Sequence, residues 1–204
     1  RPMIVLTFDD GPHAPVTNRI LDSLEANGGR ATFFMVGNRV TGKANKAAVA
    51  RMAALGCEVA NHTYEHKAIT KLGAEGIKSQ LARANDSIRL AGGVSPVLMR
   101  PPGGAKSDAA MKTVGSMGMS AVLWSIDTLD WKTKNAQNTI NVVLSSVKDG
   151  DIILMHDLYG TSADAAVVLI PELKKRGYQL VTVSEMASLR GGMTPGQEYH
   201  SFRP

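Results

Sequence analysis

The chain has 204 residues, of which 44% are hydrophobic and 20% are charged. This length suits one domain with a sizeable core and is short for two, and the composition excludes a disordered or fibrous protein. The formal charge of +5 is spread along the chain without a basic block, which favours an anionic partner such as a bacterial wall over nucleic acid.

Strand-like and helix-like segments alternate along the whole chain. The apolar segments predict strands at Met3–Phe8, Ala31–Val36, Cys57–Ala60, Val97–Met99, Ser120–Trp124, Asp151–Met155 and Gln179–Val183. Helical spacing predicts helices at Pro15–Ala26, Lys43–Leu55, Ala74–Leu90, Ser107–Met117, Ala136–Val147, Ser162–Arg176 and Ser184–Arg190. Ser107 is a candidate N-cap, and residues 191–204 form a polar tail after a main domain of residues 1–190.

Seven strands that alternate with helices predict parallel pairing, right-handed crossovers and a buried sheet. An α/β barrel-like closure is the expected architecture, and a doubly wound open sheet is the alternative. The glycine pairs follow helices rather than strands, so there is no G-x-G-x-x-G dinucleotide motif.

The sequence predicts no disulfide, no thiolate metal site and no membrane span. Cys57 is the only cysteine, so no intrachain disulfide or thiolate metal site can form, and its apolar neighbours predict a buried thiol. No run approaches the length of a membrane span, and no signal peptide is visible.

The unusual polar residues follow the predicted strands. Parallel strands in a barrel point their carboxyl ends at one face, which is the face that carries active sites. The segments concerned are Asp9-Asp10, Asn61–His66, Arg100–Gly104, Ser125–Trp131 and His156-Asp157.

Two adjacent acids, Asp9 and Asp10, end the first strand ahead of Gly11-Pro12. Neighbouring buried carboxylates repel each other, so a cation or a shared proton is expected between them. Solvated turn carboxylates are the plain alternative, because Asp favours turns.

His62 and His66 stand four residues apart, and on a helical turn this spacing puts both imidazoles on one side. With a carboxylate from another strand end they would form a two-His, one-Asp catalytic zinc set. His13 and His200 are competing histidines. His13 is expected at the rim beside the acids, and His200 is expected to be structural or disordered in the tail.

Arg100 precedes two prolines, which hold its backbone extended, and its guanidinium is a candidate bidentate partner for one of the acids. Gly103 and Gly104 permit a backbone N–H to face a developing oxyanion. A surface arginine and plain turn glycines are the alternatives.

The segments Asp130-Trp131 and His156-Asp157 complete the set. A carboxylate near a histidine raises the pKa of the imidazole, which suits a general acid. Trp131 serves either as packing or as a wall for a sugar ring or methyl group.

Together these motifs resemble the NodB-homology polysaccharide deacetylases, carbohydrate esterase family four. The resemblance runs from the first strand to about Leu189 and rests on five ordered motifs. They are Thr7-Phe8-Asp9-Asp10-Gly11-Pro12, His62-Thr63-Tyr64-Glu65-His66, Arg100-Pro101-Pro102-Gly103-Gly104, Asp127-Thr128-Leu129-Asp130-Trp131 and Leu154-Met155-His156-Asp157. It implies a distorted (β/α)7 barrel that removes acetyl groups from a polysaccharide.

The resemblance also implies roles for single residues. Asp10, His62 and His66 match the family's metal ligands, Asp9 matches the catalytic base, and Arg100 matches the residue that orients this base.

His156 matches the general acid and Asp130 its tuning partner, while Trp131 and Leu154 match the pocket for the acetyl methyl. Gly103 stands where the family commonly has Tyr, and it keeps the backbone N–H that the family uses for the oxyanion. This departure affects substrate preference more than activity.

The implied cofactor is one divalent ion, Zn²⁺ with Co²⁺ as the alternative, and the implied partner is an acetylated wall polymer or oligosaccharide of peptidoglycan or chitin type. A monomeric, secreted or wall-associated bacterial hydrolase is expected. Deacetylation of acetylxylan and a non-catalytic carbohydrate-binding relative remain as alternatives. A glycosidase is disfavoured, because adjacent acids such as Asp9 and Asp10 are poorly placed on opposite sides of a scissile bond.

Overall fold

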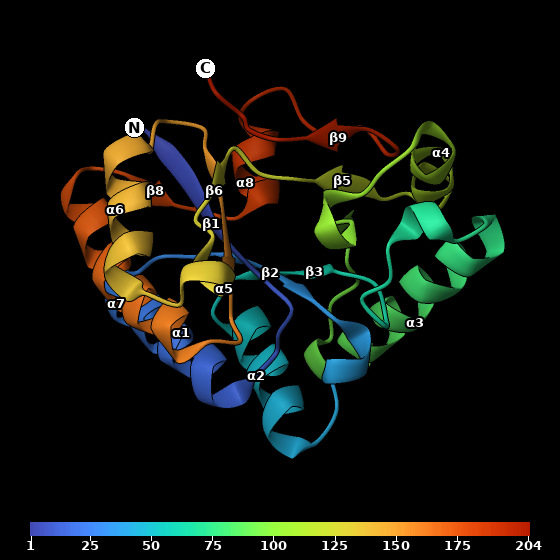
Figure 1. The fold of residues 1–204 in the computed structure, drawn as a ribbon, viewed down its shortest axis with the longest axis horizontal. Coiled ribbons are helices and arrows are strands. Elements are labelled where there is room, and N and C mark those ends of the chain that lie inside the picture. The colour runs from blue at the N-terminus through green and yellow to red at the C-terminus, as the bar shows by residue number, and fades with distance from the viewer.

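The computed structural model describes all 204 residues, which form one parallel β-sheet flanked by helices (Figure 1). The strands are β1 (Met3–Asp9), β2 (Thr32–Met35), β3 (Glu58–Asn61), β4 (Leu98–Met99), β5 (Ser120–Val122), β6 (Ile126–Asp127), β7 (Ile152–His156), β8 (Gln179–Leu180) and β9 (Glu198–Tyr199). The helices are α1 (Ala14–Asn27), α2 (Lys43–Ala54), α3 (Ala74–Gly92), α4 (Asp108–Ser116), α5 (Asp130–Thr133), α6 (Ala136–Ser146), α7 (Gly160–Lys175) and α8 (Val183–Ser188). Every predicted strand and helix is present with its ends shifted by a few residues, and β6, β9 and α5 are additional.

The sheet is a curled half-barrel. Its strands are ordered β6-β7-β1-β2-β3-β4-β5-β9, all paired in parallel, and β8 also pairs with β1. From β1 to β5 each strand lies beside its successor, without the reversal of strand order that marks a doubly wound sheet. The edge strands β6 and β9 do not pair with each other. The distorted barrel expected from the sequence is therefore confirmed, and the doubly wound alternative is wrong.

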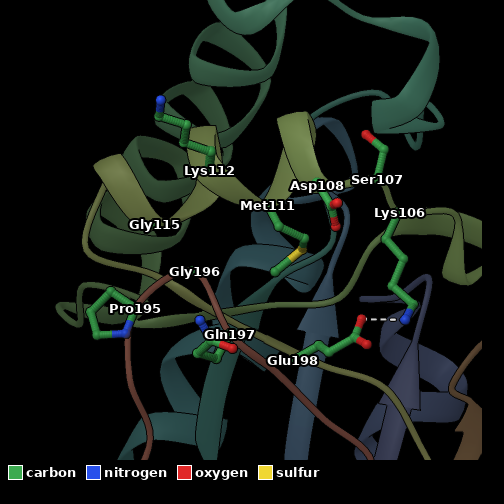
Figure 2. Close-up of a pocket in the computed structure, with 10 residues that line it drawn as sticks. All are labelled: Lys106, Ser107, Asp108, Met111, Lys112, Gly115, Pro195, Gly196, Gln197 and Glu198. Carbon is green, nitrogen blue, oxygen red and sulfur yellow. Dashed lines mark ion pairs between the residues drawn. The ribbon is translucent and has the colours of Figure 1, made fainter.

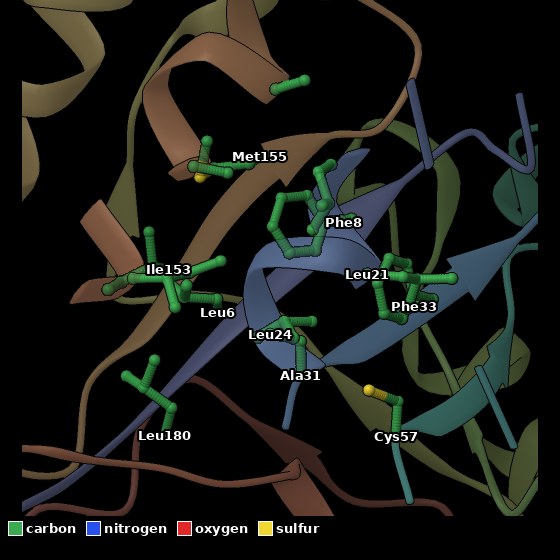
Figure 3. Close-up of a cluster of buried hydrophobic side chains, with 14 of the residues drawn as sticks. Leu6, Phe8, Leu21, Leu24, Ala31, Phe33, Cys57, Ile153, Met155 and Leu180 are labelled. Atoms are coloured by element: carbon green, nitrogen blue, oxygen red, sulfur yellow. The ribbon is translucent and has the colours of Figure 1, made fainter. Parts of the chain in front are cut away.

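The side chains of β1 alternate between two apolar layers. Ile4, Leu6 and Phe8 lie in the cluster between the sheet and the helices α1 and α7, part of which Figure 3 shows. Met3 and Val5 point the other way, into an interior cluster shared with α8 and the end of the chain. The remaining inward positions of β1 are polar, and they lead into the candidate site.

The last residues belong to the sheet rather than to a loose tail. Strand β9 pairs with β5, and Asp151, just before β7, forms an antiparallel bridge with Ser201. Phe202 is buried in the interior cluster. Both ends of the chain consequently lie at the same edge of the molecule (Figure 1).

Side-chain caps fix where α4 and α8 begin. Ser107 caps α4 by accepting a hydrogen bond from the Ala110 N–H at 3.2 Å, as the sequence predicted. The predicted seventh strand is cut short because Thr182 and Glu185 form a capping box that starts α8. None of the helices combines the length and the apolar character that crossing a bilayer requires.

Candidate active site

A pocket of about 330 Å³ lies at the carboxyl ends of the strands. Of the residues to which the family resemblance assigns roles, all line it except Arg100 and Asp130, which lie behind it and bind residues that line it. Pro101, Trp124, Asp127 and Tyr159 also line it. The predicted convergence of the strand ends at one face is thus observed.

Asp10, His62 and His66 meet at one corner of this pocket. Their ligand atoms all lie within 4.8 Å of one another, and Asp10 Oδ1 is 3.1 Å from the Nε2 atoms of both histidines. Two ligands held tetrahedrally at zinc–ligand distances lie about 3.3 Å apart. Asp10 Oδ1 is buried and accepts no hydrogen bond, which leaves its lone pairs free. The corner therefore fits a divalent cation, and no other group of this kind occurs in the chain.

His62 presents one defined nitrogen to this corner. Its Nδ1 lies 2.7 Å from the backbone oxygen of Arg100. Because a carbonyl oxygen only accepts, Nδ1 must donate, and Nε2 is the ring nitrogen that faces Asp10. A fixed tautomer of this kind is what a metal-binding histidine requires.

The backbone around the three residues is strained. Asp10 (φ 77°), Thr63 (φ 64°) and His66 (φ 56°) are all left-handed, which is uncommon outside glycine and costs about 1–3 kcal/mol per residue. The expected helical turn across His62 and His66 is wrong, because the segment is a loop that follows β3.

Two side chains stabilise this loop. Gln80 of α3 is buried, and its Oε1 accepts hydrogen bonds from the N–H groups of Tyr64 (3.1 Å) and Glu65 (2.8 Å). Asn61 Oδ1 accepts from the Thr63 N–H at 2.8 Å.

Asp9 is anchored by a buried arginine. Arg100 Nη1 donates to Asp9 Oδ1 at 2.8 Å and lies 2.7 Å from Thr7 Oγ1. Its Nε and Nη2 donate to the carbonyl oxygens of Val122 and Leu123. The pairing with Asp9 is single rather than bidentate, and Asp9 Oδ2 is left 3.7 Å from His62 Nε2.

Asp130 holds His156 on the other side of the pocket. Its Oδ1 lies 2.7 Å from His156 Nδ1 and accepts from the Trp131 N–H, while its Oδ2 accepts from the His156 N–H and from Ser162 Oγ. The four bonds fix the ring, so His156 Nε2 points into the pocket, 3.9 Å from Asp10 Oδ2.

These contacts shift the ionisation of the site residues. Burial alone would lower the pKa of His156, but Asp130 outweighs it and raises this pKa to about 9. Burial opposes the charge on Asp10, yet His62 and His66 hold its pKa below the usual range. The contact with Asp10 also raises the pKa of His66. Asp130 thus favours the protonated form of His156, and the two histidines favour the charged form of Asp10.

The pocket walls are partly apolar. Leu154 is buried, whereas Trp131 on α5 is 47% exposed and offers its ring to a ligand. Gly103 has φ 66°, and a side chain there would extend into open space. The pocket wall is consequently open at Gly103.

A larger cavity, of about 690 Å³, lies between α4 and the segment that carries β9 (Figure 2). Lys106 and Glu198 form an ion pair in it. It holds no group of metal-ligating side chains, so size alone does not identify the site.

Sequence reasoning missed several residues that support the site. Tyr159 lines the pocket with its ring 6.5 Å from that of His156, while Gln80 and Ser162 act by tertiary contacts that leave no local pattern. His13 and His200 are both exposed and do not line the pocket.

Comparison with known proteins agrees with this geometry. Residues 1–122 match the family model described as polysaccharide deacetylase. The peptidoglycan-N-acetylmuramic acid deacetylase PdaC of Bacillus subtilis is 41% identical over 188 residues, 92% of this chain and 39% of that protein. The chain thus spans about two fifths of the length of PdaC.

Two further relatives are matched over most of their length. A peptidoglycan-N-acetylglucosamine deacetylase of Bacillus cereus is 36% identical over 189 residues, 90% of this chain and 87% of that protein. A family 4 acetyl xylan esterase from Clostridium thermocellum, solved with a cobalt ion, has a TM-score of 0.90 and 32% identity over 98% of both chains. The chain therefore belongs to the polysaccharide deacetylases, the NodB-homology group of carbohydrate esterase family four.

Proposed function

We propose that the chain is a metal-dependent hydrolase that removes acetyl groups from N-acetylglucosamine residues of a peptidoglycan or chitin-type polymer and releases acetate. One observation carries the proposal: the Asp10–His62–His66 corner shares a pocket with the Asp9–Arg100 and Asp130–His156 pairs. Two of the relatives are named for deacetylation of peptidoglycan, which supports the substrate class.

Asp10, His62 and His66 would hold the ion. Two imidazoles and one carboxylate are a donor set that suits Zn²⁺, and Co²⁺ is the alternative, since the acetyl xylan esterase was solved with cobalt. When bound, such an ion polarises the acetyl carbonyl and lowers the pKa of a water molecule.

Asp9 is proposed as the general base. Arg100 occupies its Oδ1 and prevents the carboxylate from rotating, while Oδ2 remains free beside the corner. Oδ2 is therefore the atom that takes the proton of the attacking water.

His156 is proposed as the general acid. Because Nδ1 is bound to Asp130, the proton for the departing sugar amine resides on Nε2, the nitrogen that faces the pocket. A pKa raised to about 9 keeps this nitrogen protonated at neutral pH.

The remaining wall residues are proposed to bind the acetyl group. The Gly103 N–H stabilises the developing oxyanion, and Leu154 and Trp131 surround the methyl group. All of these groups come from one chain, so we expect a monomer to be active. A secreted or wall-associated bacterial setting follows from the proposed substrate.

Removal of O-acetyl groups from acetylxylan is the second candidate. The similarity to the acetyl xylan esterase and the open wall at Gly103 favour it. The residues of the pocket would act in the same way, with a sugar hydroxyl rather than an amine as the leaving group.

The test is to measure acetate released by the chain from chitooligosaccharides, peptidoglycan and acetylxylan, with zinc or cobalt supplied after chelation. The Asp9→Asn variant is the control for contaminating esterases. Release from the first two substrates is expected. Release from acetylxylan alone would favour the second candidate, and glycan binding without any release would contradict both.

A further inference from the structure

Asp157 is a fully buried carboxylate that the proposed chemistry does not use. It follows His156 at the end of β7, and burial raises its pKa to about 7. A buried carboxylate is costly unless hydrogen bonds compensate for the lost water. Its hydrogen bonds therefore indicate its structural role.

Both oxygens of Asp157 accept hydrogen bonds from the segment that follows β1. The Gly11 N–H donates to Oδ1 at 3.2 Å, and Thr17 Oγ1 donates to Oδ2 at 2.7 Å. The Thr17 oxygen already accepts from the His13 N–H at 3.0 Å, so its own proton is directed at Asp157. The carboxylate thus ties the end of β7 to the loop that starts α1.

The bond to Gly11 acts on Asp10. The Gly11 N–H belongs to the peptide plane that joins Asp10 to Gly11, and the orientation of this plane is set by the ψ angle of Asp10. The Asp10 N–H donates to the Phe34 carbonyl at 3.3 Å, and the Gly11 carbonyl accepts from the Val36 N–H at 3.0 Å. The left-handed backbone of Asp10 is therefore held from the β2 side and from Asp157.

The packing leaves no room for a side chain at position 11. A Cβ atom on Gly11 would lie 2.2 Å from Asp157 Oδ2 and 2.5 Å from its Cγ. Gly11 is thus required by the close approach of the carboxylate, and not only by the turn.

We propose that Asp157 is a positioning residue of the metal corner, which holds the strained Asp10 backbone in place through the Gly11 N–H. The inference rests on the proposed metal-binding role of Asp10. Groups that orient metal ligands typically contribute about 10- to 100-fold to metal affinity.

The test is direct measurement of metal affinity in Asp157→Asn at pH 8. Zn²⁺ is titrated against a chromophoric chelator, and Co²⁺ is followed by its visible absorption, which reports ligand geometry. The Asn side chain fills the same space, but it is uncharged, and its NH₂ group replaces one of the two acceptor oxygens. We expect affinity about 10- to 100-fold weaker and an altered cobalt spectrum.

Asp151→Asn is the matched control. Asp151 is also a fully buried carboxylate with several hydrogen bonds, and it lies at the opposite end of β7. A merely structural role for Asp157 predicts that both variants lose stability alike and that neither loses metal affinity. The same affinity loss in both, or in neither, would overturn the inference.

Gly11→Ala changes the other partner of the same contact, and it can be measured if Asp157→Asn fails to fold. Its methyl group must displace the carboxylate, so metal affinity is expected to fall. In the Asp157→Ala background the methyl group has space, so the double variant should bind metal as Asp157→Ala does. Wild-type affinity in Gly11→Ala would contradict the proposal. Failure of the wild-type chain to bind metal would instead contradict the proposed function.

Discussion

The two sides of the pocket are built in different ways. Asp9 and Asp130 are each bound to a side-chain partner, and the Asp130 carboxylate accepts four hydrogen bonds from within the chain. At the metal corner Asp10 Oδ1 accepts none, and two of the three candidate ligands have left-handed backbone. The chain alone thus supplies the partners of Asp9 and Asp130, whereas the proposed ion would complete the corner at Asp10. Changes at the two sides should consequently have separable effects.

The largest effect is expected at the metal corner. His62→Ala removes one of three ligands and should weaken zinc affinity by about 10²-fold or more, with loss of activity at limiting zinc. Elemental analysis after dialysis checks it. Full retention of zinc would remove His62 from the ligand set.

Asp9→Asn should separate the two sides. The variant loses the proton acceptor but keeps Asp10, His62 and His66, so activity should fall about 10²-fold or more while metal remains bound. The measurement pairs kcat with metal content in the same sample. Near-normal turnover would show that another group takes the proton.

Asp130→Asn should change the pH profile. Asp130 raises the pKa of His156, and the proposed general acid is the protonated form of His156, so activity should be lost as the pH rises through this pKa. The alkaline limb should lie at or below about 9, because a bound cation lowers the pKa of a neighbouring histidine. Without the Asp130 charge the limb should move to lower pH in a plot of kcat/KM. An unmoved limb would mean that His156 is not the titrating acid.

Trp131→Ala should have the smallest effect. The ring is about half exposed at the pocket wall, where it would contact bound substrate, so KM should rise several-fold, by about 1 kcal/mol or less of binding, with little change in kcat. Steady-state kinetics on a soluble oligosaccharide measure the two constants separately. Equal loss in kcat would place Trp131 in the chemical step.

Much of this arrangement could be predicted from the sequence. Parallel strands bring their carboxyl ends to one face. The acids at the end of β1 and the histidines after β3 were therefore expected to meet there, once the alternation of strands and helices was recognised. The left-handed conformation of Thr63 and His66 could not be predicted. Thr63 is β-branched and such residues rarely adopt it, and only tertiary contacts such as those of Gln80 support the loop.

The strands that the sequence did not predict show no repeated alternation of apolar and polar residues. Strand β9 has two residues, Glu198 and Tyr199, and it forms at an edge by pairing with β5. Such a short polar segment shows no periodicity of its own. The burial of Phe202 likewise depends on the distant strands that surround it.

Arg100 has a consequence for anyone who redesigns this protein. Its fully buried guanidinium spans the hollow of the half-barrel, from Thr7 and Asp9 on β1 to the carbonyl groups at the end of β5. Strands β2, β3 and β4 separate these two in the sheet. Since removing one partner of a buried ion pair costs about 3–5 kcal/mol, a library that varies Arg100 would lose folded protein together with turnover. Selection for new substrates should keep Arg100 and vary the residues around Gly103 and Trp131, where the pocket wall is open.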